Sequence, residues 1–110
     1  MLTSKQRAKL KSVGAELSAA YQMGKNEIDE NYIIQVNAGL DAREIIKISV
    51  LENSGHTARE AAEILAEKTD AEIVQVIGAK VVLYRKSRKP EKRELSKLIE
   101  GVKIIKKFKN

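Results

Sequence analysis

The chain has 110 residues, of which 43% are apolar and 33% are charged, and its formal net charge is +6 at pH 7. This length is typical of one domain, and the apolar content is enough for a single core. Cysteine is absent, which excludes disulfides, thiolate metal sites and cysteine nucleophiles. No apolar stretch follows the first lysines, and no run reaches the length of a membrane span, so we expect a soluble cytoplasmic protein without a secretory signal.

The charge is unevenly placed along the chain. Residues 85–110 hold 11 Lys and Arg against 3 Asp and Glu, whereas residues 1–84 hold 10 basic and 12 acidic side chains. Residues 1–11 again carry four cations and no acid. Clustering of this kind, with a pI near 9.6, is typical of proteins that bind nucleic acid, although basic tails often only keep a protein in solution.

The first predicted element is a helix over residues 4–17. Thr3 and Gln6 form a capping box at its start. Three apolar residues recur at helical spacing and predict its buried stripe: Leu10, Val13 and Leu17. We expect the basic side chains of this helix to lie on its other faces.

A strand, a loop and a second helix follow. Residues 20–23 are short and β-permissive, and residues 24–27 form a loop that begins with glycine. The second helix is expected over residues 29–40, with Asp29 near its N-terminus, where the helix dipole favours an acid. Its predicted buried stripe is Tyr32 or Ile33, then Val36 and Leu40.

Residues 44–51 alternate between apolar and polar side chains, which predicts a half-buried strand. Its apolar face holds Ile46, Ile48 and Val50, and its other face holds Lys47 and Ser49. An Asn-Ser-Gly run at residues 53–55 then breaks the chain. A second capping box, Thr57 with Glu60, starts a helix that runs to about residue 68.

Residues 71–77 and 80–85 are two β-type runs that meet at Gly78, which can take the positive φ of a tight hairpin turn. The element order is therefore αβαβαββ. It predicts a single α/β domain, with three helices packed on a mixed four-stranded sheet whose last two strands are antiparallel.

The chain after the hairpin is predicted to form a separate unit. We place a domain over residues 1–87 and a basic extension over residues 88–110. Pro90 suits a first helical position, and four apolar residues recur at helical spacing: Leu95, Leu98, Ile99 and Val102. Gly101 interrupts this pattern, so either a helix or a partly disordered extension remains open.

Few residues could carry catalysis. His56 is the only histidine and comes just before a helix cap, and no nucleophile, metal-binding cluster or Walker-type motif accompanies it. We expect no enzyme, no metal, no cofactor and no small-molecule substrate.

The loop at residues 24–27 is a stronger candidate for binding. Gly24 and Lys25 lie between a short strand and a helix N-terminus, where backbone N–H groups and one cation can approach a phosphate. A plain turn is the alternative, because short turns with glycine are common.

Five segments of the chain carry a family resemblance: LTSKQ at 2–6, QMGKN at 22–26, LDAREIIK at 40–47, VQVIG at 74–78 and VLYR at 82–85. In this order they resemble the YhbY family of small bacterial proteins, which consist of one CRM domain (chloroplast RNA splicing and ribosome maturation). The resemblance implies a fold similar to that of the C-terminal domain of translation initiation factor three. It also implies RNA binding and an association with precursors of the large ribosomal subunit.

The family's G-x-x-G loop, which approaches the RNA backbone, maps to residues 24–27. The resemblance carries over to Gly24, Lys25 and, less directly, Asn26. Glu27 departs from it, because an acid replaces the second glycine and could repel phosphate.

We therefore expect a non-enzymatic, monomeric RNA-binding protein, with ribosomal RNA during large-subunit assembly as the implied target. No aromatic stacking platform is evident, so backbone and shape recognition should outweigh base reading. The predicted RNA contacts are Lys5, Arg7, Lys9, Lys11, Gly24, Lys25, Asn26, Lys47, Lys80, Arg85, Lys86 and Arg88. The alternative is a protein-interaction or membrane-surface module that acts through a basic amphipathic helix over residues 95–108.

Overall fold

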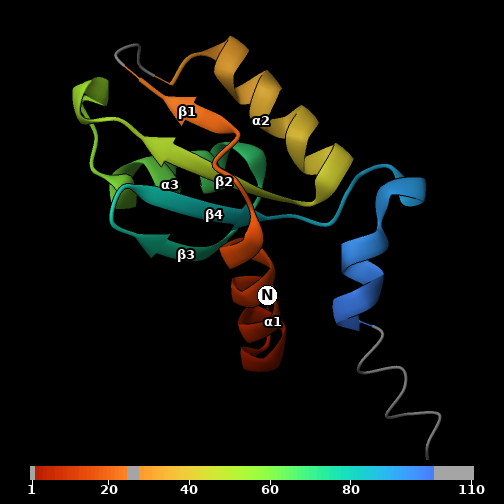
Figure 1. Ribbon diagram of the computed structural model, residues 1–110. Coiled ribbons are helices and arrows are strands. Elements are labelled where there is room, and N and C mark those ends of the chain that lie inside the picture. The colour runs from red at the N-terminus through yellow and green to blue at the C-terminus, as the bar shows by residue number, and fades with distance from the viewer. Residues whose placement is uncertain (1, 25–27, 101–110) are drawn as a thin grey trace, which may run out of the picture.

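The computed structural model describes residues 2–24 and 28–100 of the chain. The elements in chain order are α1 (Ser4–Glu16), β1 (Tyr21–Met23), α2 (Glu30–Arg43), β2 (Ile45–Val50), η1 (Glu52–Ser54), α3 (Ala58–Thr69), β3 (Glu72–Ile77), β4 (Lys80–Tyr84) and η2 (Pro90–Lys92). A further helical segment, which we call the 94–100 helix, covers the end of the described chain (Figure 1).

The four strands form one mixed sheet in the order β1-β2-β4-β3. β1 runs parallel to β2, whereas β2 with β4 and β3 with β4 are antiparallel. The last two strands meet at Gly78, whose φ of 55° is the left-handed conformation that glycine adopts without strain. The predicted mixed sheet and its closing hairpin are therefore confirmed.

The number of helices differs from the prediction. The sequence predicts three helices, and the described residues hold four, because the 94–100 helix packs on the sheet as well. Its apolar residues Leu95 and Ile99 join a core cluster, and Gly101 lies outside the described residues. The apolar spacing therefore correctly predicts a helix over residues 94–100, where Leu95 and Ile99 pack on the domain.

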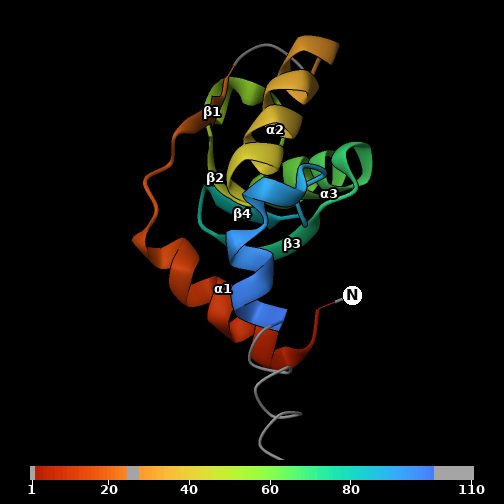
Figure 2. The same cartoon turned by 90° about the vertical axis from the view of Figure 1, so that its right-hand side faces the viewer.

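Helices cover both faces of the sheet, so the molecule has three layers (Figures 1 and 2). On one face, α2 and α3 contribute to a cluster that includes Leu40, Ile48 and Leu65, all fully buried. On the other face, α1 and the 94–100 helix contribute Leu10 and Ile99 to a smaller cluster. We call this second face of the sheet, together with α1, the α1 side.

The alternation in β2 predicts a half-buried strand, and this prediction is wrong. Ser49, on the face predicted to meet solvent, is only 8% exposed. Ile45 points to the same face and lies in the smaller cluster. The sequence pattern gives the more apolar face correctly, but it does not reveal that α1 and the 94–100 helix cover part of the other.

α1 packs on the sheet through the predicted stripe. Leu10 is fully buried, and Val13 and Leu17 pack against the same cluster. A Cβ atom at Gly14 would lie 3.0 Å from Val82 Cγ1, so α1 crosses the sheet at close range there. The stripe is confirmed, and it fixes which faces of α1 remain free.

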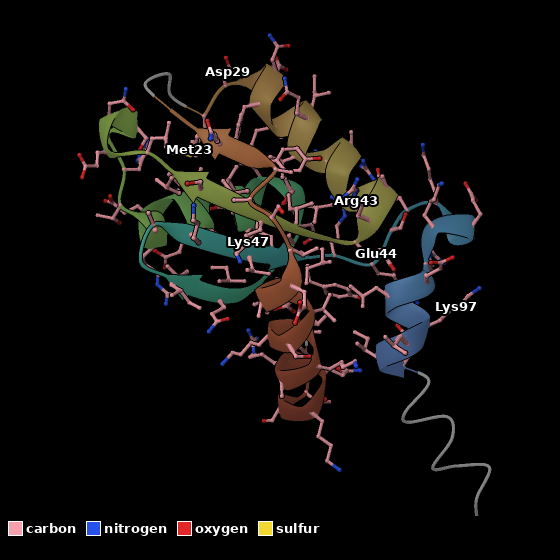
Figure 3. The ribbon with its side chains drawn as sticks, viewed as in Figure 1. Met23, Asp29, Arg43, Glu44, Lys47 and Lys97 are labelled. Carbon is pink, nitrogen blue, oxygen red and sulfur yellow. The ribbon has the colours of Figure 1, made fainter. Side chains whose placement is uncertain are left out.

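A buried carboxylate holds the chain that follows β4 against the domain. Glu44 ends α2 in the left-handed conformation and is fully buried. Its carboxylate accepts N–H bonds from Ser87 at 2.7 Å and Ser96 at 2.9 Å, and the Ser96 hydroxyl donates a third bond. These donors replace the water that the carboxylate loses on burial. Figure 3 shows Glu44 at the end of α2, next to the 94–100 helix.

The predicted boundary at residue 87 stays a prediction. Residues 88–100 lie on the domain, with Ser96 and Ile99 buried. Of the two states left open for residues 88–110, the helix applies to residues 94–100. The rest of the extension lies outside the described residues.

Candidate nucleic-acid interface

The four cations of α1 do not share one environment. Lys5, Lys9 and Lys11 are exposed, as the stripe on the opposite face of the helix predicts. Arg7 is half-buried, and its Nη1 donates a hydrogen bond to the Ile73 carbonyl on β3. Arg7 therefore fastens α1 to an outer strand, and the three lysines form the solvent-facing positive charge of this helix.

Two more predicted cations, Lys47 and Lys80, lie on the same side of the sheet. The register places Lys47 opposite Val82 and Lys80 opposite Ser49, on the face that carries α1. Lys47 Nζ donates to the Leu17 carbonyl at 3.3 Å, and Lys80 Nζ donates to Ser49 Oγ at 3.0 Å. Figure 3 shows Lys47 over the middle of the sheet. Each ammonium group has three N–H donors, so one such bond leaves others for a ligand.

Gly24 lies at the end of β1, where the candidate loop begins. A Cβ atom there would meet only Leu51 Cδ1, at 3.6 Å, which is an ordinary contact. The fold therefore has room for a side chain at Gly24, and its φ lies outside the left-handed range. Lys25, Asn26 and Glu27 lie outside the described residues, so the role predicted for this loop stays a prediction.

Arg85 is predicted to contact a nucleic acid, but the structure places its side chain inside the protein, only 10% exposed. Its Nη1 donates to Asn37 Oδ1 and to the Thr69 carbonyl, both at 2.6 Å, and its Nη2 lies 2.8 Å from Asp41 Oδ1. The guanidinium thus ties the end of β4 to α2 and α3. A group used in this way is not presented to a partner.

The next two cations of the chain are paired with acids. Arg88 Nη2 lies 2.6 Å from Asp41 Oδ2, and Lys86 Nζ lies 3.5 Å from Glu100 Oε2. Both cations remain largely exposed, at 63% and 51% of their side-chain surface. Arg88 lies beside α2, away from the cations of α1, so the predicted site residues fall into two groups.

Asp41 joins the two arginines at the C-terminal end of α2. Its side-chain hydrogen bonds with Arg88, reinforced by those of Arg85, hold the pKa of the Asp41 carboxyl well below its usual range, although burial acts in the opposite direction. Sequence reasoning missed Asp41 and Glu44, even though both lie in the LDAREIIK segment. Their partners are more than 40 residues away, and only the folded chain brings them together.

Other kinds of site find little support in the described part of the chain. No group of His, Cys, Asp and Glu side chains there could hold a metal ion. None of the helices described is long and apolar enough to cross a bilayer. His56 is half-buried in the turn before α3, where its backbone N–H donates to Ser54 Oγ at 3.2 Å.

The fold and its charges define a small α/β domain with a mixed sheet covered on both faces and a cationic helix on one side. The model of one family, the CRS1/YhbY (CRM) domain, matches residues 2–85. The chain belongs to this family, as the resemblance indicates.

Several relatives share most of their length with this chain. It is 39% identical over 95 residues to "Probable RNA-binding protein YqeI" of Bacillus subtilis, covering 86% of this chain and 99% of the relative. It is 30% identical over 86 residues to an "RNA-binding protein" of Haemophilus influenzae, covering 78% and 87%. The solution structure of the hypothetical protein SAV1595 from Staphylococcus aureus, described as a candidate RNA-binding protein, matches with a TM-score of 0.69 and 42% identity, covering 86% of this chain and 98% of that one.

The first prediction concerns Asp41→Asn. Because the folded-state pKa of Asp41 is depressed, its stabilisation is fully present above the unfolded-state pKa of about 4 and is lost as the pH falls below it. Urea unfolding should show the variant about 1–3 kcal/mol less stable than wild type at pH 7, with a smaller difference at acidic pH.

Asp70→Asn is the matched control for this variant. Asp70 is exposed and takes the left-handed conformation that asparagine tolerates. A stability difference for Asp41→Asn that is the same at neutral and acidic pH would contradict the role given to the Asp41 carboxylate.

Proposed function

We propose that this protein binds RNA through its α1 side and does so without catalysing a reaction. The observation that carries the proposal is the gathering of cations there: Lys5, Lys9, Lys11, Lys47 and Lys80. Membership of the CRM family and the names of the relatives support RNA as the polyanion.

The binding mechanism is electrostatic in the first place. Each lysine that meets a phosphate releases a counterion from the RNA, so the affinity falls as the salt concentration rises. Phosphate contacts position the RNA without reading its sequence. Gly24, at the end of β1, would let the loop backbone approach a phosphate closely, since no side chain stands in the way.

We further propose that the RNA is ribosomal and belongs to a precursor of the large subunit. The family resemblance supports this target, together with a cytoplasmic, monomeric protein. The alternative, an amphipathic helix over residues 95–108, has less support. In the described part of that helix, Leu95 and Ile99 pack on the domain, so this part of its apolar stripe is already occupied.

A triple variant of α1 tests the proposed surface. Lys5→Gln, Lys9→Gln and Lys11→Gln together should leave the fold intact, because all three side chains are exposed. RNA affinity should fall at least about tenfold at low salt, and the slope of log affinity against log salt should become shallower by about 2, or 0.7 for each lost phosphate contact. Fluorescence anisotropy over a salt series measures both quantities.

The matched control removes three cations from the other side of the molecule. Arg43, Arg59 and Lys68 are exposed on α2 and α3, and their change to Gln lowers the net charge by the same amount. If this control weakens RNA binding as much as the α1 variant does, the effect is one of total charge, and the α1 side is not the binding surface.

Gly24→Ala tests the loop separately. Because a Cβ atom at Gly24 makes only an ordinary contact with Leu51, the melting temperature should stay within a few degrees of wild type. RNA affinity should fall several-fold, because the methyl group keeps the backbone away from a phosphate. Unchanged affinity would identify Gly24 as part of a plain turn.

The RNA target is tested by crosslinking in cells, followed by sequencing of the attached RNA. The crosslinked reads should be enriched in large-subunit ribosomal RNA and its precursors relative to their share of total RNA. The triple α1 variant, expressed at the same level, provides the background. Enrichment in messenger or transfer RNA instead would overturn the ribosomal assignment and leave RNA binding itself intact.

A further inference from the structure

The α1 side of the sheet has a partly open half, which borders the smaller core cluster at Val82. Two neighbouring cross-strand rows make it up: Gln22–Ser49–Lys80–Ile77 and Lys47–Val82–Gln75. Ser49 and Val82 are buried, and the other side chains are half-buried or exposed. Each row combines side chains from different strands, and neither contains an acid. Of these residues, the sequence predicts only the two lysines as RNA contacts, because the rows become visible only with the strand register.

A groove runs between this open half and the C-terminal part of α1. Gly14 and Ala15 form one wall, and Gln75, Ile77 and Lys80 are among the residues that face it. The close approach of Gly14 to Val82 holds the wall in place. The groove measures about 110 Å³, which is smaller than the ~150 Å³ closed cavity that accommodates one benzene ring in a protein.

Three kinds of chemistry meet in this groove. Gln75 offers an amide that both donates and accepts hydrogen bonds. Ile77 is 59% exposed. Covering such an apolar surface with a flat ligand removes it from water and favours binding. Lys47 and Lys80 supply positive charge, and their bonds to Leu17 and Ser49 hold both ammonium groups close to the sheet.

A nucleotide matches all three features. Its base has an apolar face and a hydrogen-bonding edge, and its phosphate carries negative charge. We propose that the groove takes one unpaired base of an RNA strand, with the base against Ile77 and Gln75 and the adjoining phosphate at Lys47 or Lys80. This inference rests on the proposed RNA binding and adds a preference for single-stranded RNA.

The size of the groove argues against a duplex as its occupant. The volume suits one ring system, not a base pair. An A-form duplex also keeps its bases stacked and paired, with their major-groove edges in a deep, narrow groove that side chains cannot read, whereas single strands can splay their bases into a protein. The α1 lysines remain able to contact the phosphates of either form.

The test compares a short single-stranded RNA with the same sequence in a full duplex, by fluorescence anisotropy at one salt concentration. Wild type should bind the single strand more tightly. The double variant Gln75→Ala/Ile77→Ala should bind the single strand about tenfold more weakly, which is the loss expected for one base contact. Its affinity for the duplex should not change. Ile77→Ser alone, at the exposed end of β3, provides a second variant if the double variant does not fold.

Gln35→Ala/Ile34→Ala is the matched control, since it removes the same side-chain types from the exposed surface of α2. It should keep the preference for the single strand. Equal binding of both RNAs by wild type, or a preference that survives loss of Gln75 and Ile77, would overturn the inference. Failure of the proposed function would give a different result. Wild type would then bind both RNAs weakly, and the triple lysine variant of α1 would bind them no more weakly than wild type.

Discussion

The burial of Leu10 against the second face of the sheet is the interaction on which the rest of this structure depends. Leu10 lies fully buried in one cluster with Ile45, Val82 and Tyr84, and burial of one such side chain contributes about 2–3 kcal/mol. It fixes α1 across three strands of the sheet. The helix then presents its lysines to solvent on one side of the molecule, and its C-terminal part forms the wall of a groove. A mixed sheet with helices on one face only would have neither feature.

A second constraint concerns charge. The cations that follow β4 dominate the net charge of the sequence, yet the first three of them are paired with acids. Arg85 is inside the protein, Arg88 pairs with Asp41, and Lys86 pairs with Glu100. Together with the buried Glu44 carboxylate, Asp41 fastens residues 85–96 to the end of α2. The total charge therefore does not show which cations are free to meet a polyanion.

Local signals in the sequence were sufficient for most of the fold. The capping boxes at Thr3 and Thr57 are formed, and the turn at Gly78 is where the sequence predicts it. The errors have one cause, which is contact between distant segments. Alternation in β2 could not reveal the cover on its second face, and nothing near Arg85 indicates that Asp41 lies beside it. The row that joins Gln75 to Lys47 likewise depends on strand register, which a single sequence does not show.

RNA bound as we propose lies on the α1 side, over the lysines of α1 and the open half of the sheet. A titration of the isotope-labelled protein with a short single-stranded RNA, followed through backbone amide chemical shifts, tests it most directly. The largest shifts should occur in α1, at Gly24 and along Gln75 to Lys80, with small shifts in α3. The largest shifts in α3 and along the exposed surface of α2, with α1 unchanged, would contradict it.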